Sequence, residues 1–143
     1  EYGVLLLKNP NESVSTSETY KKYSNKYCHQ YLTNNEVIET ARNNLRDNSL
    51  NRLNFEDKHL TIKNDLQLVV ENENDSVKHA LYLLSNLKNS LTFSMSGSGP
   101  TCFAIFKDVD TAKIELKENY KIFKDKGYDS WVCTLLENGI TFV

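Results

Sequence analysis

The sequence is poor in glycine and proline, with only five glycines and two prolines among its 143 residues. This composition excludes collagen-like chains and low-complexity chains rich in these residues. Gly97 and Gly99 nevertheless stand beside Pro100 within one apolar stretch, SMSGSGPTCFAIF, which covers residues 94–106. Scarce residues placed together in this way indicate a point where the backbone turns sharply or approaches something closely.

Cysteine and histidine are also scarce. The three cysteines, Cys28, Cys102 and Cys133, form no CxxC pair, and their number is odd. This argues against a disulfide framework and a zinc site and favours a reducing compartment. The three histidines are far apart in the sequence and lack metal-ligand spacing. They are expected at the surface, and no metal site is expected.

The chain lacks a strong charge of either sign and any long hydrophobic run. Its 17 basic and 19 acidic residues give a formal net charge of −2. This balance argues against a nucleic-acid partner, which would favour a basic surface. No run reaches the ~18 apolar residues of a membrane-spanning helix, so no membrane partner is expected.

The length of 143 residues and the hydrophobic content of 39% suit a single domain, residues 1–143. The first residue is Glu1 rather than Met, and an apolar run begins almost at once. We therefore expect the chain to be a piece of a longer protein, in which any targeting segment lies upstream.

Short apolar runs and helical periodicity divide the chain into strands and helices. Strands are predicted over residues 4–7, 91–95, 101–106, 129–136 and 140–143. Helices are predicted over residues 15–27, 37–45, 66–70, 77–87 and 110–126. The expected helix caps are Ser15, Asp65 and either Asp75 or Ser76. Two hairpins and segregated helices indicate an α+β fold, in which helices cover one face of an antiparallel sheet.

Three stripes of apolar side chains recur at helical spacing and are expected to face the core. They comprise Val77, Ala80, Leu81, Leu84 and Leu87; Ala112, Leu116, Tyr120 and Phe123; and Tyr20, Tyr23, Tyr27 and Tyr31. For the tyrosine stripe, an aromatic binding face is the alternative to a place in the core.

The glycine turn admits two interpretations. Gly97-Ser98 or Ser98-Gly99 suits the centre of a tight hairpin, which requires no ligand. A Ser-Gly-Ser-Gly run also offers successive unhindered N–H groups and two hydroxyls between rigid strands. Such a concavity can hold an anion or pack against another phosphate-binding loop.

Residues 95–106, MSGSGPTCFAIF, resemble the third conserved motif of the GHMP kinase superfamily. Further stretches agree in order and spacing with the C-terminal half of these kinases. They are LLLKNP with VSTSETY (residues 5–10 and 14–20), KNDLQLVV (63–70, with Gln67 where Glu is usual) and DSWVCTLLENGI (129–140). The resemblance spans nearly the whole chain and is weakest over residues 28–60.

Within the superfamily, the Met-Ser-Gly-Ser-Gly-x-Thr form and VSTSETY are most similar to one kind of member. Those kinases transfer the γ-phosphate of ATP to the 2-hydroxyl of a CDP-linked methylerythritol in non-mevalonate isoprenoid biosynthesis. The resemblance implies a ferredoxin-like α+β domain, with a four-stranded antiparallel sheet and helices on one face. It also implies substrate-binding roles for Thr16, Ser17, Tyr20, Gly97, Ser98, Gly99 and Thr101. Thr16, Ser17 and Tyr20 would lie near the cytosine, on which a flat aromatic ring can stack.

The same resemblance implies that this chain acts with an N-terminal half of the same protein. That half would carry the catalytic Lys and Asp and the long glycine-rich loop that holds the phosphates of ATP. No GxxxxGK[ST] motif occurs here. ATP and Mg²⁺ are therefore expected in the full-length enzyme but not on this chain alone, which is expected to be inactive. The compartment would be a bacterial cytoplasm or, in a plant, the plastid stroma.

Two other interpretations remain open from the sequence. One keeps the fold and changes the substrate, as in a GHMP kinase of the homoserine or mevalonate type; the VSTSETY stretch argues for the CDP-linked substrate. The other is a free-standing α+β module that binds a ligand or a protein.

Overall fold

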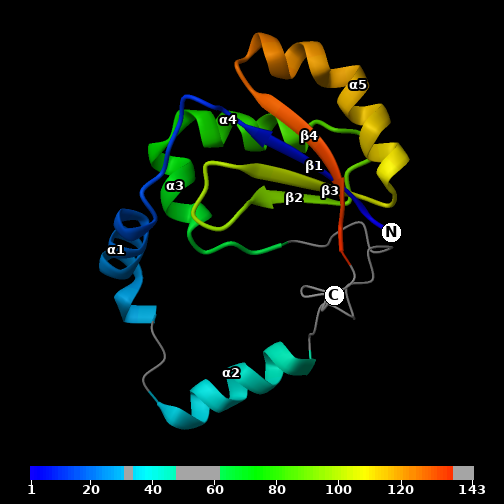
Figure 1. The fold of residues 1–143 in the computed structure, drawn as a ribbon. Coiled ribbons are helices and arrows are strands. Elements are labelled where there is room, and N and C mark those ends of the chain that lie inside the picture. Colours follow the sequence, from blue (N-terminus) through cyan, green and yellow to red (C-terminus); the bar gives the residue numbers. More distant parts are fainter. Residues whose placement is uncertain (31–33, 48–61, 137–143) are drawn as a thin grey trace, which may run out of the picture.

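A four-stranded antiparallel sheet organises the chain in the order β2-β3-β1-β4 (Figure 1). The computed structural model describes residues 1–30, 34–47 and 62–136. The strands are β1 (Gly3–Lys8), β2 (Thr92–Met95), β3 (Cys102–Phe106) and β4 (Asp129–Thr134). The predicted α+β class and antiparallel sheet are thus confirmed, while the strand predicted over residues 140–143 lies outside the described residues.

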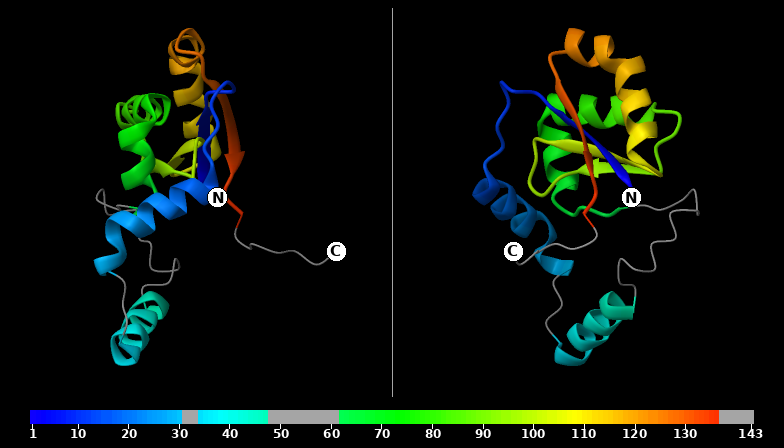
Figure 2. Two further views of the ribbon diagram at one scale, coloured as in Figure 1. Left: turned by 90° about the vertical axis from the view of Figure 1, so that its left-hand side faces the viewer. Right: turned by 45° about the vertical axis from the view of Figure 1, so that its right-hand side comes forward.

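Five α-helices accompany the sheet in the described ranges. They are α1 (Thr16–Tyr27), α2 (Asn35–Asp47), α3 (Gln67–Glu73), α4 (Asp75–Ser85) and α5 (Val109–Asp125), with a short 3₁₀ turn at Cys28–Gln30. Seen edge-on, α4 and α5 lie on the same side of the sheet (Figure 2). The prediction that helices pack on one face is therefore confirmed. In the part of the chain that the structure describes, no helix is both long and apolar enough to cross a membrane.

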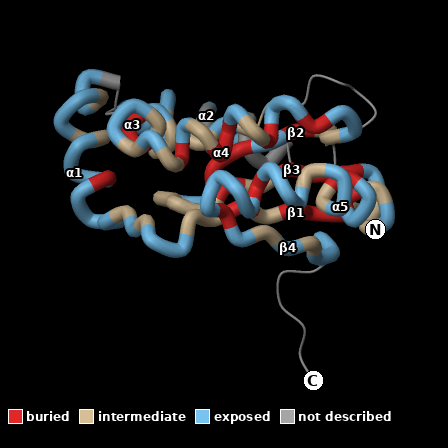
Figure 3. The backbone as a smooth tube through the Cα atoms, turned by 90° about the horizontal axis from the view of Figure 1, so that it is seen from above, coloured by how far each residue is buried: buried red, intermediate tan, exposed pale blue. Residues whose placement is uncertain are grey.

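The core lies between the sheet and these two helices, where the buried residues gather in Figure 3. Leu5 and Leu7 alternate along β1 and point to the helix side, where both are fully buried. The predicted stripe is buried as expected: Val77, Ala80, Leu81 and Leu84 lie on α4, and Leu87 lies two residues beyond the end of that helix. Burying a leucine side chain stabilises the fold by roughly 1.5–3 kcal/mol, so these positions dominate its stability.

One predicted inward position on α5 is wrong. Ala112 and Phe123 are buried as expected, but Tyr120 is 51% exposed. The buried side of the helix instead includes Glu115, which is only 2% exposed. Its Oε1 accepts a hydrogen bond of 2.7 Å from Nδ2 of Asn89, which precedes β2. A polar side chain can therefore face the core because a hydrogen-bond partner lies beside it.

Replacing Glu115 by alanine is expected to lower the free energy of unfolding by about 1–3 kcal/mol, because Asn89 loses its hydrogen-bond acceptor. Glu115→Gln keeps an acceptor oxygen and should cost less. Glu118→Ala, on the exposed side of the same helix, should change stability by no more than about 0.5 kcal/mol. Urea denaturation of the variants checks this, and equal losses for Glu115→Ala and Glu118→Ala would contradict it.

The helix caps were predicted with mixed success. Ser15 caps α1 as expected, and its Oγ accepts a hydrogen bond from the N–H of Glu18. The cap of α4 is Asn74 rather than Asp75 or Ser76, since Asn74 Oδ1 accepts from the N–H of Val77 at 2.9 Å. Asx and serine side chains are nearly equivalent caps, so the extended backbone of Asn74 decides which neighbour fills the position.

Candidate functional site

The loop between β2 and β3, here called the glycine loop, comprises residues 96–101. Ser96 N–H donates to the carbonyl of Thr101 at 2.8 Å, and Gly99 N–H donates to the carbonyl of Ser96 at 2.9 Å. A turn centred on Gly97-Ser98 therefore lies inside a wider loop, rather than forming the whole hairpin. Two of the N–H groups that could have met an anion are used within the loop itself.

Both glycines of this loop adopt the left-handed conformation, with φ of +55° at Gly97 and +82° at Gly99. Their surroundings differ. A Cβ at Gly97 would meet nothing within 4 Å, whereas a Cβ at Gly99 would lie 2.7 Å from Sδ of Met95. Met95 is buried, so the loop rests on the core at Gly99 and is open at Gly97.

Gly99→Ala is therefore expected to lower the free energy of unfolding more than Gly97→Ala. Each variant forces alanine into the left-handed region, at a cost of roughly 1–2 kcal/mol. Only Gly99→Ala must also displace Met95, which adds about 1–3 kcal/mol. Urea denaturation of the two single variants measures the difference in the free energy of unfolding. Equal losses would contradict the expectation, because they would show that the Met95 side chain moves aside at no cost.

The N-terminal end of helix α1 contacts the glycine loop. Oγ of Ser98 and Oγ1 of Thr16 lie 2.8 Å apart and are hydrogen-bonded, although 82 positions separate them in the sequence. The structure thus brings together two of the residues singled out from the sequence. Ser17 stays with the helix cap, its Oγ lying 3.2 Å from that of Ser15. Thr101 contributes its backbone carbonyl to the loop.

A cavity of about 590 Å³ opens between α1, the glycine loop and the segment that leads into α3. Its aromatic lining consists of Tyr20, Tyr23 and Phe103, and Gly97 also lines it. Tyr20 is 59% exposed, whereas the buried residue of α1 is Thr19. The interpretation of Tyr20 as a core residue is therefore wrong, because α1 turns a threonine rather than this tyrosine toward the protein interior.

The charged groups on this cavity come from residues 63–65. Nζ of Lys63 and Oδ1 of Asp65 lie 3.0 Å apart. Their hydrogen bond and the charge of Asp65 raise the pKa of Lys63, so the cavity carries a protonated lysine beside a carboxylate. Lys63, Asn64 and Phe103 had no site role in the sequence-based prediction. The KNDLQLVV motif was the signal that could have drawn attention to the first two.

Cys102, at the start of β3, is not a reactive group of this site. It is fully buried, and burial, with a smaller contribution from the charge of Glu71, raises the pKa of its thiol to about 12. The thiolate is the nucleophilic form of cysteine, so Cys102 remains an uncharged core residue beneath the loop at neutral pH.

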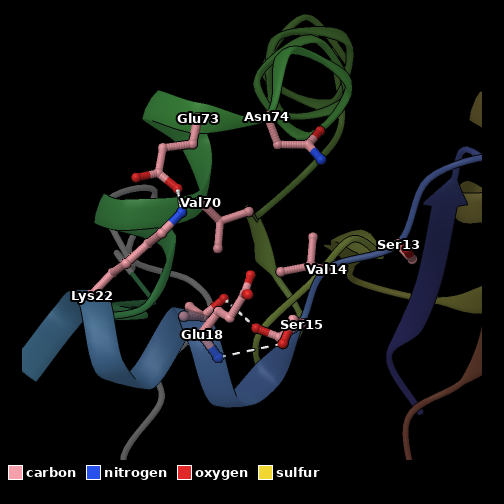
Figure 4. Close-up of a pocket in the computed structure, with 9 residues that line it drawn as sticks. Ser13, Val14, Ser15, Glu18, Lys22, Val70, Glu73 and Asn74 are labelled. Atoms are coloured by element: carbon pink, nitrogen blue, oxygen red, sulfur yellow. Dashed lines mark hydrogen bonds and ion pairs between the residues drawn. The ribbon is translucent and has the colours of Figure 1, made fainter.

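A smaller cavity of about 150 Å³ lies where α1 packs against α3 and the start of α4 (Figure 4). Lys22 reaches from α1 to Glu73 of α3, with Nζ 2.6 Å from Oε2. Both side chains are half exposed, so the pair contributes little to the stability of the fold. This junction orients α1, and with it Tyr20, without presenting reactive groups of its own.

The chain is similar to known proteins along its whole length. The family described as GHMP kinases C terminal matches residues 34–124. A 4-diphosphocytidyl-2-C-methyl-D-erythritol kinase of Prochlorococcus marinus strain MIT 9312 is 76% identical over 143 residues, which are all of this chain and 46% of that protein. The proteins of the same name from strains MIT 9515 and NATL1A are 57% and 38% identical.

Among solved structures, a homoserine kinase from Cytophaga hutchinsonii superposes with a TM-score of 0.53. Its sequence identity is 20%, and the match covers 94% of this chain and 42% of that one. This likeness shows the fold alone. The chain spans about half the length of the curated relatives it matches.

Proposed function

Because this chain belongs to the GHMP kinase family and matches its C-terminal domain, we propose that it forms the substrate-binding half of a small-molecule kinase. The full-length protein would transfer the γ-phosphate of ATP to the 2-hydroxyl of 4-diphosphocytidyl-2-C-methyl-D-erythritol. The names of relatives that match the whole chain at up to 76% identity support this substrate. The relatives' bacterial origin supports a cytoplasmic location.

The observation that carries the proposal is the shared cavity of Tyr20 and Gly97. A half-exposed tyrosine ring offers a flat face on which a pyrimidine can stack. The glycine loop lines the same cavity through Gly97, where it can approach the phosphates that link the base to the sugar alcohol. Thr16 links α1 to this loop through its hydrogen bond to Ser98. We assign base contact to Thr16, Ser17 and Tyr20, and phosphate contact to Gly97, Ser98, Gly99 and Thr101.

The chemistry of transfer is assigned to the other half of the protein. Among the residues that the structure describes, no group of three or more His, Cys, Asp or Glu could hold a metal ion. We assign no step through Mg²⁺ to these residues. What this chain contributes is one wall that binds and orients the acceptor, which is a large part of catalysis when phosphoryl transfer depends on positioning.

The test uses the full-length protein with ATP and Mg²⁺. CDP-methylerythritol, homoserine and mevalonate are supplied in turn, and ADP release is followed. Release with the CDP-linked substrate alone is expected. Release with homoserine or mevalonate instead would show that the assigned substrate is wrong, while the family assignment would still hold. Release with none of the three would overturn the proposed function.

A further inference from the structure

We propose that Asn64 is a positioning residue that sets the conformation of the glycine loop, and that this conformation is needed for phosphoryl transfer. The need for it in phosphoryl transfer rests on the proposed function. Nδ2 of Asn64 donates to the carbonyl of Met95 at 2.7 Å and to the carbonyl of Gly97 at 2.8 Å. Oδ1 of Asn64 accepts from the N–H of Leu66 at 3.0 Å. One amide hydrogen thus binds the end of β2 and the other binds the glycine loop, and the oxygen anchors the side chain to its own segment.

Gln67 reinforces this arrangement from the first turn of α3. Its Oε1 accepts from the N–H of Met95 at 2.9 Å and from the hydroxyl of Ser94 at 3.1 Å. The N–H and the carbonyl of Met95 are therefore both bound by amide side chains from one short segment. Gln67 Nε2 donates to Glu71 at 3.2 Å, which a carboxylate at position 67 could not do. The amide at position 67 is thus suited to this particular neighbour.

These contacts fix the loop at the point where it enters the cavity. Asn64 binds the carbonyls of Met95 and Gly97, so it holds the peptide groups that join Met95 to Ser96 and Gly97 to Ser98. Gly97 and Asn64 line the same cavity as Tyr20. Because a misplacement of about 1 Å can cost about 10²-fold in rate, a side chain that fixes this wall acts on turnover without touching the reacting atoms.

The test is Asn64→Asp in the full-length protein. The substitution keeps the shape and the oxygen acceptor, removes both N–H donors, and places a carboxylate against two carbonyl oxygens. We expect kcat with the CDP-linked substrate to fall about 10²-fold. The KM for that substrate should rise by a smaller factor than kcat falls, because the glycine loop is assigned to the phosphates of the substrate while Tyr20 is unaffected.

Asn72→Asp is the matched control. Asn72 also donates from Nδ2 to a backbone carbonyl, that of Leu68 at 2.7 Å, and lies on α3 away from the loop. It undergoes the same chemical change and gains the same charge. Its kcat should stay within about twofold of the parent protein.

Amide hydrogen exchange provides a readout that does not depend on activity. In Asn64→Asp, the amides of Ser96 and Gly99 should exchange about tenfold faster or more, as expected when two hydrogen bonds that hold the loop are lost. Amides of α4 and α5 should keep their rates in both variants. If Asn64→Asp does not fold, Asn64→Ala, which adds no charge, is measured in the same way with the same expectations.

The outcomes separate this inference from the proposed function. Unchanged exchange in the glycine loop would overturn the positioning role, whatever the activity. Faster exchange in the glycine loop with an unchanged kcat would show that Asn64 sets the loop but does not matter for phosphoryl transfer, which would overturn that half of the proposal. If the parent protein phosphorylates none of the offered substrates, the proposed function fails, and faster exchange confined to the loop would still support Asn64 as the residue that sets the loop.

Discussion

The 143-residue chain on its own, supplied with ATP, Mg²⁺ and CDP-methylerythritol, is expected to release no ADP above the uncatalysed background. In-line phosphoryl transfer requires nucleotide phosphates, metal and acceptor hydroxyl to be held together. Holding reactants in place can supply about 7–11 kcal/mol of the barrier. In the proposed assignment, the cavity beside Tyr20 provides one wall of such a site, and the described residues contain no group of three or more His, Cys, Asp or Glu that could hold a metal ion.

The measurement is a coupled ADP assay that compares the isolated chain with the full-length protein at equal concentration. Circular dichroism establishes first that the isolated chain is folded, so that inactivity cannot be attributed to unfolding. Turnover by the folded 143-residue chain would contradict the assignment of catalysis to the other half.

Tyr20→Ala in the full-length protein is expected to raise the KM for the CDP-linked substrate about 5–150-fold, with a much smaller effect on the KM for ATP. Loss of stacking between a base and an aromatic ring costs about 1–3 kcal/mol. Tyr20 is 59% exposed and lines the cavity. Its removal should therefore weaken binding of the CDP-linked substrate and change the stability of the fold only a little. Steady-state kinetics with each substrate varied in turn measures the effect.

Two further variants make this experiment specific. Tyr20→Phe keeps the ring and should bind the substrate almost as the parent does. Tyr82→Ala removes a tyrosine that is similarly exposed, at 63%, on α4 and does not line the cavity, so its KM should not change. A similar KM in Tyr20→Ala and Tyr82→Ala would remove Tyr20 from the site.

Local patterns predicted much of the fold. The stripe on α4 was predicted because helical spacing depends only on residues within two turns of each other. The exact cap of α4 was not, since Asn74 and its neighbours have similar capping chemistry and the backbone decides between them. Burial of Glu115 was missed for a different reason. It depends on Asn89, and such a pair has no signature in the sequence.

The site was harder to predict from the sequence than the fold. Nothing local to residue 16 or to residue 98 indicates that their hydroxyls meet; only the family resemblance placed both in one site. Asn64 lies within the KNDLQLVV motif, but its hydrogen bonds to the end of β2 and to the glycine loop depend on how α3 is placed against the end of β2. Contacts between distant segments depend on the tertiary arrangement, and helical or strand periodicity does not encode them.

The central place of β1 also has a consequence for biosynthesis. This strand pairs with β3 and β4, whose residues follow it by about a hundred positions. At about 5–20 residues per second on the ribosome, the nascent chain carries β1 for roughly 5–20 s before its first partner emerges. An apolar strand with two open edges is a template for incorrect pairing. The strand order therefore makes synthesis, rather than the finished domain, the stage at which chaperone protection against aggregation is most needed.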